Sequence, residues 1–377
     1  MGLVHALLGG RRGRRLLLEF ALESEAVLLH ERTEFPLHAG LFDASYALES
    51  ARGDAVVYSR SAVKDSRRST ITPGEIAALL AETPLLPVTA ELLRKALVNS
   101  VNSARYWQEP DGHDLIAGSV TVRAELVRVA EHLADSEHAA HWMSSVDLDR
   151  QWFVQWQQAD APSRWTPSGE PAAAVLQAWQ NAALTEEVRA EAERPLDPKA
   201  PWGGEWWSRP PAALLHSTGE FHDESPVGLW CVEDGFGWEK AESMAVTVPS
   251  SARIFEIVDA YSWAQLCSIY PLEITAQKRH DWYRTSGRVG RWVIPDFSQM
   301  ARDYDGVHLG VAAYLLTAGE SIEVDAERAS MVAGWNPDQT YWFTDEARLQ
   351  LDSLTWECLD ANSDDATWSR VPEDLGQ

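Results

Sequence analysis

At 377 residues the chain is longer than one hydrophobic core usually supports, so we expect more than one domain. Its 45% hydrophobic and 24% charged residues are typical of a globular protein. The net charge of −25 disfavours general nucleic-acid binding, because phosphate recognition depends on Lys and Arg. Three scattered cysteines, Cys231, Cys267 and Cys358, are too few for a disulfide framework and indicate buried thiols in a reducing compartment.

Charge and tryptophan are distributed unevenly along the chain. Residues 1–70 carry 10 basic and 9 acidic side chains, whereas the rest carry 22 and 48. All 18 tryptophans lie between Trp107 and Trp368. Tryptophan combines a large apolar face with an N–H that needs a partner when it is buried, so this density predicts an aromatic core, an aromatic-lined pocket, or both. We therefore expect the first hundred residues to be built differently from the rest.

The sequence predicts a cytoplasmic protein without membrane association. No apolar run reaches the roughly 18–20 residues that a membrane-spanning helix needs. Near the start, four arginines at positions 11, 12, 14 and 15 follow a short apolar piece, and this is the reverse of the order in a secretory signal.

The predicted elements begin with a small mixed α/β part at residues 1–70. Its apolar stretch 16–29 fits a helix, or a strand followed by a helix, and 55–59 reads as a strand. Residues 71–194 are predicted to be mostly helical. Thr72 as N-cap, Pro73 at the first position and Glu75 in the first turn predict a helix that runs to Glu82. Further helices are expected at 89–106, 115–133 and 172–194, with a short helix or extended stretch around Trp152 and Trp156.

A connection rich in proline and tryptophan, residues 195–210, is too aromatic for a flexible linker and is predicted to be packed and irregular. Residues 211–345 then form a mixed, tryptophan-rich β-containing domain, so the fold class is α+β. Its strands are expected at 212–217, 227–232, 245–248, 253–258 and 340–343, its helices at 262–270 and 296–303, and a strand or buried helix at 306–316. The acidic tail, 346–377, is expected to fray.

The sharpest local anomaly is the segment 278–292, which holds five Lys and Arg side chains against one Asp in an otherwise acidic region. Arginine suits phosphate and carboxylate geometry, and tryptophan can stack on a ring. We therefore predict ligand-binding roles for Arg279, Trp282, Arg284 and Arg288. The alternative is that these cations pair with the protein's own carboxylates.

Three other places carry groups suited to chemistry. Ser217 and Thr218 follow His216 on a predicted strand and are candidates to line a ligand cleft, with His216 catalytic. Glu256, like the pair at 233–234, lies at a strand end and is a candidate catalytic carboxylate. His308 is a candidate acid/base group, or else a core histidine with satisfied hydrogen bonds. No motif with metal-ligand spacing is evident, so no metal site is predicted.

Residues 210–345 resemble a group of uncharacterised actinobacterial proteins. The likeness implies no function. It lies in Phe255-Glu256-Ile257 with Trp263, Leu266, Tyr270 and Pro271, in Pro295-Asp296, in the segment Tyr304 to Leu309 and in the segment Gly334 to Thr340. The short strands with Ser217-Thr218 on one of them are also loosely similar to ADP-ribosyltransferase-like folds. That resemblance implies NAD as the cofactor, but residues 210–345 lack the Glu-x-Glu signature of those enzymes.

Two functions therefore remain open. The first is an enzyme acting on a nucleotide or another small anionic ligand, with NAD-dependent ADP-ribosyl transfer as the specific form that the second resemblance implies. The second is a non-enzymatic module that binds a protein partner through tryptophan-rich surfaces. A deep cleft containing His216 together with Arg284 or Arg288 favours the enzyme, whereas a broad exposed tryptophan patch favours the binding module.

Overall fold

The computed structural model describes residues 2–28, 35–52, 71–157, 170–235, 237–361 and 366–372. The chain divides into two compact units, unit 1 with Met1–Ser100 and Glu109–His141, and unit 2 with Val101–Gln108 and Trp142–Gln377. This division lies elsewhere than the boundaries expected near residues 70 and 194. All 18 tryptophans fall within unit 2, so their distribution follows the division. The α+β fold class is as the sequence predicts.

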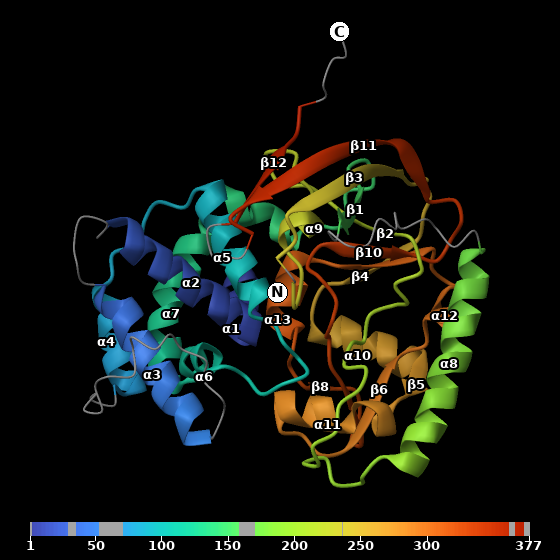
Figure 1. Cartoon of the computed structure of the whole chain (residues 1–377), viewed down its shortest axis with the longest axis horizontal. Helices are drawn as coiled ribbons and strands as arrows, with labels where there is room; N and C mark the ends of the chain where they lie inside the picture. Colours follow the sequence, from blue (N-terminus) through green and yellow to red (C-terminus); the bar gives the residue numbers. More distant parts are fainter. Residues whose placement is uncertain are drawn as a thin grey trace. The chain divides into compact units, whose positions relative to one another are not determined.

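Unit 1 is helical throughout its described residues (Figure 1). Its helices are α1 (Leu3–Gly9), α2 (Arg11–Leu28), α3 (Pro36–Arg52), α4 (Pro73–Glu82), α5 (Ala90–Asn102), α6 (Gly112–Gly118) and α7 (Val120–Ala134), followed by the 3-10 helix η2 (Glu137–Met143). Helix α2 packs against α1, α6 and α7, and α4 packs against α7. The described part of the region expected to be mixed α/β is thus helical, and the strand predicted at 55–59 lies outside the described residues.

Local capping sets the helix starts in unit 1. Helix α4 has the capping box that the sequence predicts: Thr72 Oγ1 accepts a hydrogen bond from Glu75 N, and Glu75 accepts one from Thr72 N. The single helix predicted at 115–133 is instead two helices. Ser119 interrupts it with extended backbone, and its hydroxyl accepts from Val122 N to begin α7.

Unit 2 is built on an eight-stranded sheet in the order β12-β11-β3-β1-β2-β10-β7-β4. Its strands are β1 (Trp152–Gln157), β2 (His216–Thr218), β3 (Lys240–Thr247), β4 (Ile254–Ile257), β7 (Gly306–Leu309), β10 (Gln339–Trp342), β11 (Arg348–Leu359) and β12 (Thr367–Arg370). All neighbours are antiparallel except β4 and β7, whose register places Glu256 opposite His308. A smaller sheet contains β5 (Pro271–Glu273), β6 (Arg291–Pro295), β9 (Arg328–Ser330) and β8 (Ile322–Glu323), in that order.

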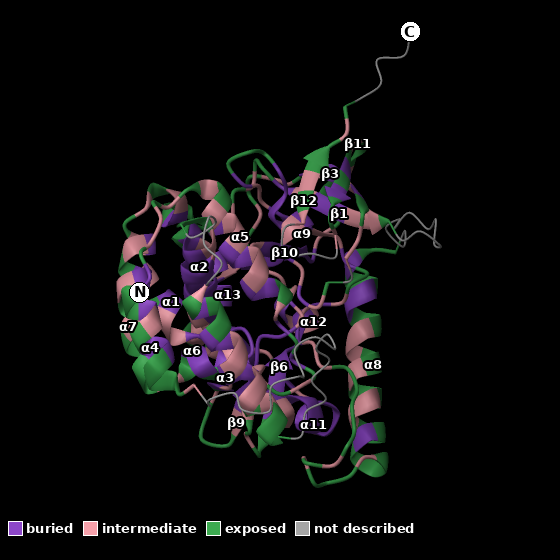
Figure 2. Ribbon diagram, turned by 60° about the vertical axis from the view of Figure 1, so that its left-hand side comes forward, coloured by how far each residue is buried: buried purple, intermediate pink, exposed green. Residues whose placement is uncertain are grey.

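Helices connect and cover these sheets (Figure 1). They are α8 (Ala172–Glu193), α9 (Val227–Trp230), α10 (Ala260–Ile269), α11 (Thr275–Ser286), α12 (Phe297–Met300) and α13 (Val311–Thr317). Helix α10 contacts strands of both sheets, β4 of the larger and β5 and β6 of the smaller. Helix α8 packs one buried stripe against α11 and α12 and exposes most of its remaining surface (Figure 2).

Unit 2 differs from the sequence prediction in several stretches. The strand predicted at 212–217 is only the short β2 (His216–Thr218), because residues 212–214 form a turn. The strand predicted at 227–232 is the short helix α9, because a four-residue apolar run fits either element and Gly228 lets the helix backbone approach Thr218 closely. The acidic tail does not simply fray: β11 and β12 pair with each other, and β11 also pairs with β3. The sheet therefore extends beyond residue 345 and also includes β1, before the predicted domain begins.

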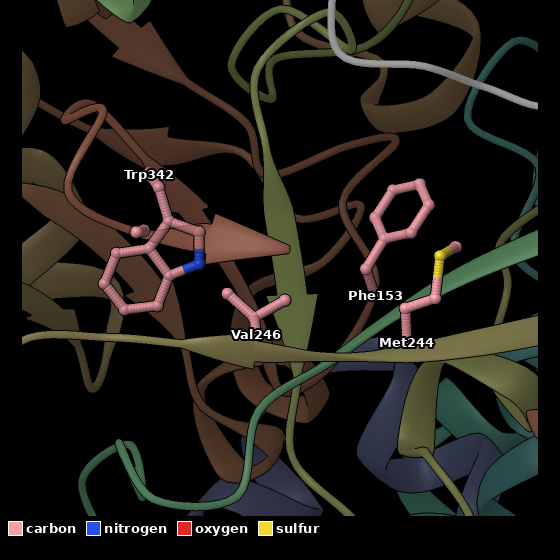
Figure 3. Close-up of a cluster of buried hydrophobic side chains, with 5 residues drawn as sticks. Phe153, Met244, Val246 and Trp342 are labelled. Carbon is pink, nitrogen blue, oxygen red and sulfur yellow. The ribbon is translucent and has the colours of Figure 1, made fainter. Parts of the chain in front are cut away.

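The core of the large sheet is aromatic and aliphatic. One cluster joins Phe153, Met244, Val246 and Trp342 (Figure 3). A second joins Val154, Leu229 and Trp356. Indole N–H groups in this core find hydroxyl partners: Trp342 donates to Ser217 (2.8 Å) and Trp356 to Ser243 (2.9 Å). Both indoles thus satisfy their single polar atom.

Candidate functional site

A cleft of about 430 Å³ opens in unit 2 beside β1, β2 and β10. Four tryptophans and a tyrosine line it, together with polar side chains. The lining residues are Trp156, Trp206, Trp207, Arg209, Ala212, His216, Val232, Glu233, Asp234, Trp238, Gly334, Asn336, Gln339 and Tyr341. Its size and its mixture of aromatic and polar groups are those of a small-molecule site. We call it the tryptophan cleft.

Two indole pairs form the aromatic walls of the tryptophan cleft. Trp156, on β1, stacks on Trp238 with ring centroids 4.9 Å apart and planes 26° apart. Trp206 and Trp207 meet edge to face, with centroids 6.1 Å apart and planes 78° apart. Gly334 permits this packing, because its φ of +68° is left-handed and an added Cβ would lie 2.4 Å from the Trp207 Cβ.

Hydrogen bonds connect the polar side chains of the tryptophan cleft to its loops. Glu233 accepts from Gly334 N through Oε2 (2.6 Å), and Glu233 N donates to Asn336 Oδ1 (3.0 Å). Asn336 N in turn donates to Gln339 Oε1 (3.3 Å). These hydrogen bonds connect the segment after β9 to the segment after α9. They also fix the positions of three polar side chains of the cleft, those of Glu233, Asn336 and Gln339.

Two cations lie in or beside the tryptophan cleft, Arg105 next to Asp234 and Arg209 in the lining. Asp234 accepts from Trp107 Nε1 (3.1 Å), and Arg105 Nε lies 3.8 Å from its Oδ1. Arg209 lines the cleft with Glu233. Its guanidinium lies 5.7 Å from the centre of the Trp207 ring and donates to Pro210 O (3.1 Å). Cation–π and carbonyl contacts thus hold this charge in place.

His216, the first predicted catalytic residue, lies in the tryptophan cleft. Burial lowers its pKa to about 4, even though a hydrogen bond to the Leu214 carbonyl favours the charged form. The imidazole is therefore neutral near pH 7. Because a carbonyl can only accept, Nδ1 carries the proton in this contact (3.1 Å) and Nε2 is left as an acceptor.

The hydroxyl groups of Ser217 and Thr218 make hydrogen bonds that stabilise the fold. Ser217 is buried, donates to Gln151 Oε1 (2.6 Å) and accepts from Trp342. Thr218 Oγ1 accepts from Gly228 N (3.2 Å), which ties β2 to α9. Both line a recess of about 10 Å³ that shares His216 with the tryptophan cleft and has room for about one water.

Glu256 and His308, predicted separately, are brought together by the parallel pairing of β4 and β7. His308 is 1% exposed and donates from Nδ1 to Glu256 Oε2 (2.6 Å) and from Nε2 to Asp338 Oδ1 (3.2 Å). Burial disfavours its charged form, but the two carboxylates outweigh burial and raise its pKa to about 9. His308 is thus a buried imidazolium.

This imidazolium holds a strained turn in place. Asp338 has a left-handed φ of +58°, and its Oδ2 accepts from Gly219 N (2.8 Å). Asp338 lies between Asn336 and Gln339 in sequence, so His308 fixes the turn that presents both amides to the tryptophan cleft. His308 is therefore a core histidine with satisfied hydrogen bonds. It does not line the tryptophan cleft, but it fixes the turn that does.

The cationic segment 278–292 forms α11 and the start of β6, and the structure gives its cations partners within the chain. Arg279 pairs with Glu191 (2.6 Å). Arg284 pairs with Asp281 and donates to the carbonyls of Trp107 (3.0 Å) and Trp202 (2.7 Å). These contacts agree with the alternative interpretation of this segment, in which its cations pair with acceptor groups of the protein itself and not with a ligand.

The remaining predicted ligand contacts of this segment are also internal. Arg288 donates to the carbonyls of Arg291 (3.0 Å) and Glu327 (3.2 Å) and covers the Trp292 ring at 4.8 Å. Trp282 is 0% exposed and donates to the Trp206 carbonyl (2.7 Å). Its ring therefore has no face for a ligand, and it supports the wall of the tryptophan cleft through the backbone of Trp206.

Sequence reasoning missed most of the tryptophan cleft. It had named His216 and the carboxylates at 233–234, but not Arg209, Asn336, Gln339 or the indoles. The available signal was the connection at 195–210: its aromatic content predicted packing, and Trp206 and Trp207 indeed pack there. What could not be foreseen is that this connection meets the turn at 334–339.

No family model, curated protein or solved structure matches the chain. Within the described part of the chain, no helix is both long and apolar enough to cross a membrane, and no group of three or more His, Cys, Asp or Glu side chains is placed to hold a metal ion. The resemblance to actinobacterial proteins and to ADP-ribosyltransferase-like folds stays a prediction.

Proposed function

We propose that the protein binds a small ring-containing molecule in the tryptophan cleft. The observation that carries this proposal is the cleft itself: about 430 Å³ walled by four indoles, with convergent side chains that can donate and accept hydrogen bonds. Aromatic walls take up the ring, and the polar side chains fix its orientation. Of the residues predicted from sequence, His216 belongs to this site.

The proposed ligand site is the tryptophan cleft and not helix α11, where the sequence predicted ligand contacts. Arg279, Arg284 and Arg288 already have carboxylate, carbonyl or ring contacts, so binding an anion there would first break these contacts. A nucleotide or NAD bound at that segment is therefore not what the geometry supports best.

The alternative of a tryptophan-rich surface for a protein partner has less support. Among the tryptophans that the structure describes, only Trp107 (39%) and Trp202 (41%) are exposed. The others contribute to the core or to the cleft, so they do not supply the broad exposed patch that a protein partner would need.

Thermal-shift and tryptophan-fluorescence titrations with sugars, nucleosides, nucleotides including NAD, inorganic phosphate and tetramethylammonium test the proposal. A ligand at 100 times its dissociation constant adds about 2.7 kcal/mol of stability. We expect Trp238→Ala to weaken binding about tenfold, because it removes an aromatic contact worth roughly 1.5 kcal/mol.

Trp202→Ala is the matched control, since it removes an exposed indole outside the cleft lining, and its binding should equal that of the wild type. Arg284→Ala tests the segment 278–292. If Arg284→Ala abolishes binding while Trp238→Ala binds normally, the ligand site is on α11 and the proposal is wrong. Failure of every compound to bind also rejects it.

A further inference from the structure

We infer that the ligand of the tryptophan cleft is an uncharged sugar, bound with the face of a pyranose ring against an indole. This inference rests on the proposed function and names the class of its ligand. Charge balance, the type of polar side chain and the arrangement of the indoles each lead to it.

The charges in and beside the tryptophan cleft balance. Glu233 and Asp234 contribute two negative charges, and Arg209 and Arg105 contribute two positive ones. His216 adds none near pH 7, because burial holds its pKa at about 4. An anionic ligand would face the two carboxylates and a cationic ligand the guanidinium of Arg209, and like charges brought together at a dry surface are costly. A neutral ligand meets neither penalty.

The polar side chains are of the kind that pairs with neighbouring hydroxyl groups. Asn336, Gln339, Glu233 and Asp234 line the cleft with planar amide and carboxylate groups, and Arg209 carries a planar fork of donors. Both amide oxygens and one oxygen of each carboxylate already accept a hydrogen bond within unit 2, so a ligand would use the amide N–H groups and the second lone pairs of these oxygens. Two adjacent hydroxyls of a pyranose offer a matching pair of donors and acceptors. A ligand with many hydroxyl groups is thus able to use most of these side chains at once.

The arrangement of the indoles distinguishes a sugar from a nucleobase. A flat base gains most from a slot between two parallel rings. Here Trp156 and Trp238 are 4.9 Å apart and cover each other, while Trp206 and Trp207 are nearly perpendicular. Each pair offers single faces and edges instead of a slot. A pyranose has one face rich in C–H groups and packs on a single ring, with its hydroxyls directed to the side.

The test is isothermal titration with a panel of neutral monosaccharides and disaccharides, nucleosides, inorganic phosphate and tetramethylammonium, at low and at high salt. We expect at least one neutral sugar to bind saturably and to change tryptophan fluorescence, with an affinity that salt leaves unchanged. Asp234→Asn should weaken sugar binding by tenfold or less, at both salt concentrations. Asp352→Asn, an exposed carboxylate on β11 outside the lining, is the matched control and should bind like the wild type.

The outcomes separate this inference from the proposed function. If a nucleoside or tetramethylammonium binds in the cleft and no sugar does, the sugar inference is overturned and the proposed function stands. A salt-sensitive affinity that Asp234→Asn lowers far more than tenfold identifies a cation and also overturns it. If no compound binds, both are rejected.

Discussion

The two units bury their polar groups in different ways. In unit 1, charges meet charges within a leucine-rich helical core: Arg12 is 0% exposed, pairs with Asp114 and donates to the Ser100 carbonyl (2.8 Å). Arg15 pairs with Asp111 (2.9 Å), and although burial opposes the charge of Asp111, this contact lowers the pKa of that carboxyl group. Removing one partner of such a buried ion pair should therefore strongly lower the stability of unit 1.

In unit 2, several buried indoles donate their N–H groups to hydroxyls or carbonyls, both at the large sheet and beside the smaller one. Trp263 donates to Ser330 (2.9 Å), in the same way that Trp342 donates to Ser217. These indoles are satisfied without buried charges, and further tryptophans line the tryptophan cleft. The comparison indicates why the proposed ligand site lies in unit 2: aromatic side chains that do not belong to the buried core line the tryptophan cleft.

The largest effect is expected where an ion pair in unit 1 is broken. Asp114→Ala leaves the guanidinium of Arg12 buried without its carboxylate, and a change of this kind costs about 3–5 kcal/mol. Unfolding followed by circular dichroism should show the loss. Tryptophan fluorescence reports only unit 2, so it should show a smaller change if the units unfold separately.

The exposed pair Lys240–Glu357 on the large sheet supplies the control, because surface ion pairs contribute about 0–1 kcal/mol. Glu357→Ala should therefore leave the unfolding free energy nearly unchanged. Equal losses for Asp114→Ala and Glu357→Ala would show that burial does not set the strength of these pairs.

His308 is a place in unit 2 where, as in unit 1, a buried charge meets carboxylates. Its folded pKa of about 9 lies above the ordinary value of 6.5, so its stabilising effect is full below about pH 6.5 and is lost as the pH rises through about 9. A shift of this size corresponds to about 3 kcal/mol. We expect the stability difference between the wild type and His308→Gln to shrink across this range.

The comparison with His308→Gln is needed because another group titrates in the opposite sense. Burial lowers the pKa of Lys278 to about 8, so the folded state gains relative stability as that amine loses its proton. Subtracting the two pH profiles removes this contribution. Parallel profiles over the whole range would mean that His308 is not charged in the folded protein.

The structural features that could be predicted from the sequence are those that depend on residues close together in the chain. The N-cap at Thr72 and the helix expected at 262–270, which is α10, are both present. The short apolar run that forms α9 lacks a period long enough to separate helix from strand.

The candidate site depended on contacts that no local pattern encodes. The cluster at 278–292 was visible because its charges are adjacent, but Glu191, Glu327 and the backbone carbonyls that engage them are distant in sequence. The tryptophan cleft was hidden for the opposite reason. Its residues lie far apart along the chain and meet only because β10 pairs with β2 and the turn before β10 folds over it.

A smaller effect is expected when a core indole of unit 2 loses its N–H. Trp263→Phe removes the hydrogen bond to Ser330 and leaves a small void, and together these should cost about 1–3 kcal/mol in unfolding free energy. Trp202→Phe, at an exposed position, should cost almost nothing. Guanidinium unfolding followed by fluorescence measures both. A loss for Trp263→Phe as large as that for Asp114→Ala would remove the contrast between the two kinds of core.

The smallest effect concerns the start of α4, where unit 1 relies on neither a buried charge nor a large side chain. Thr72→Ala removes the hydroxyl that accepts from Glu75 N, and loss of an N-cap typically costs about 1 kcal/mol. Thr72→Ser keeps the hydroxyl and should restore stability, whereas a general effect of substitution at this position would lower the stability of both variants alike. Because α4 packs against α7 in unit 1, amide exchange should accelerate in these two helices and stay unchanged in the large sheet. Faster exchange in the sheet as well would show that the two units unfold as one.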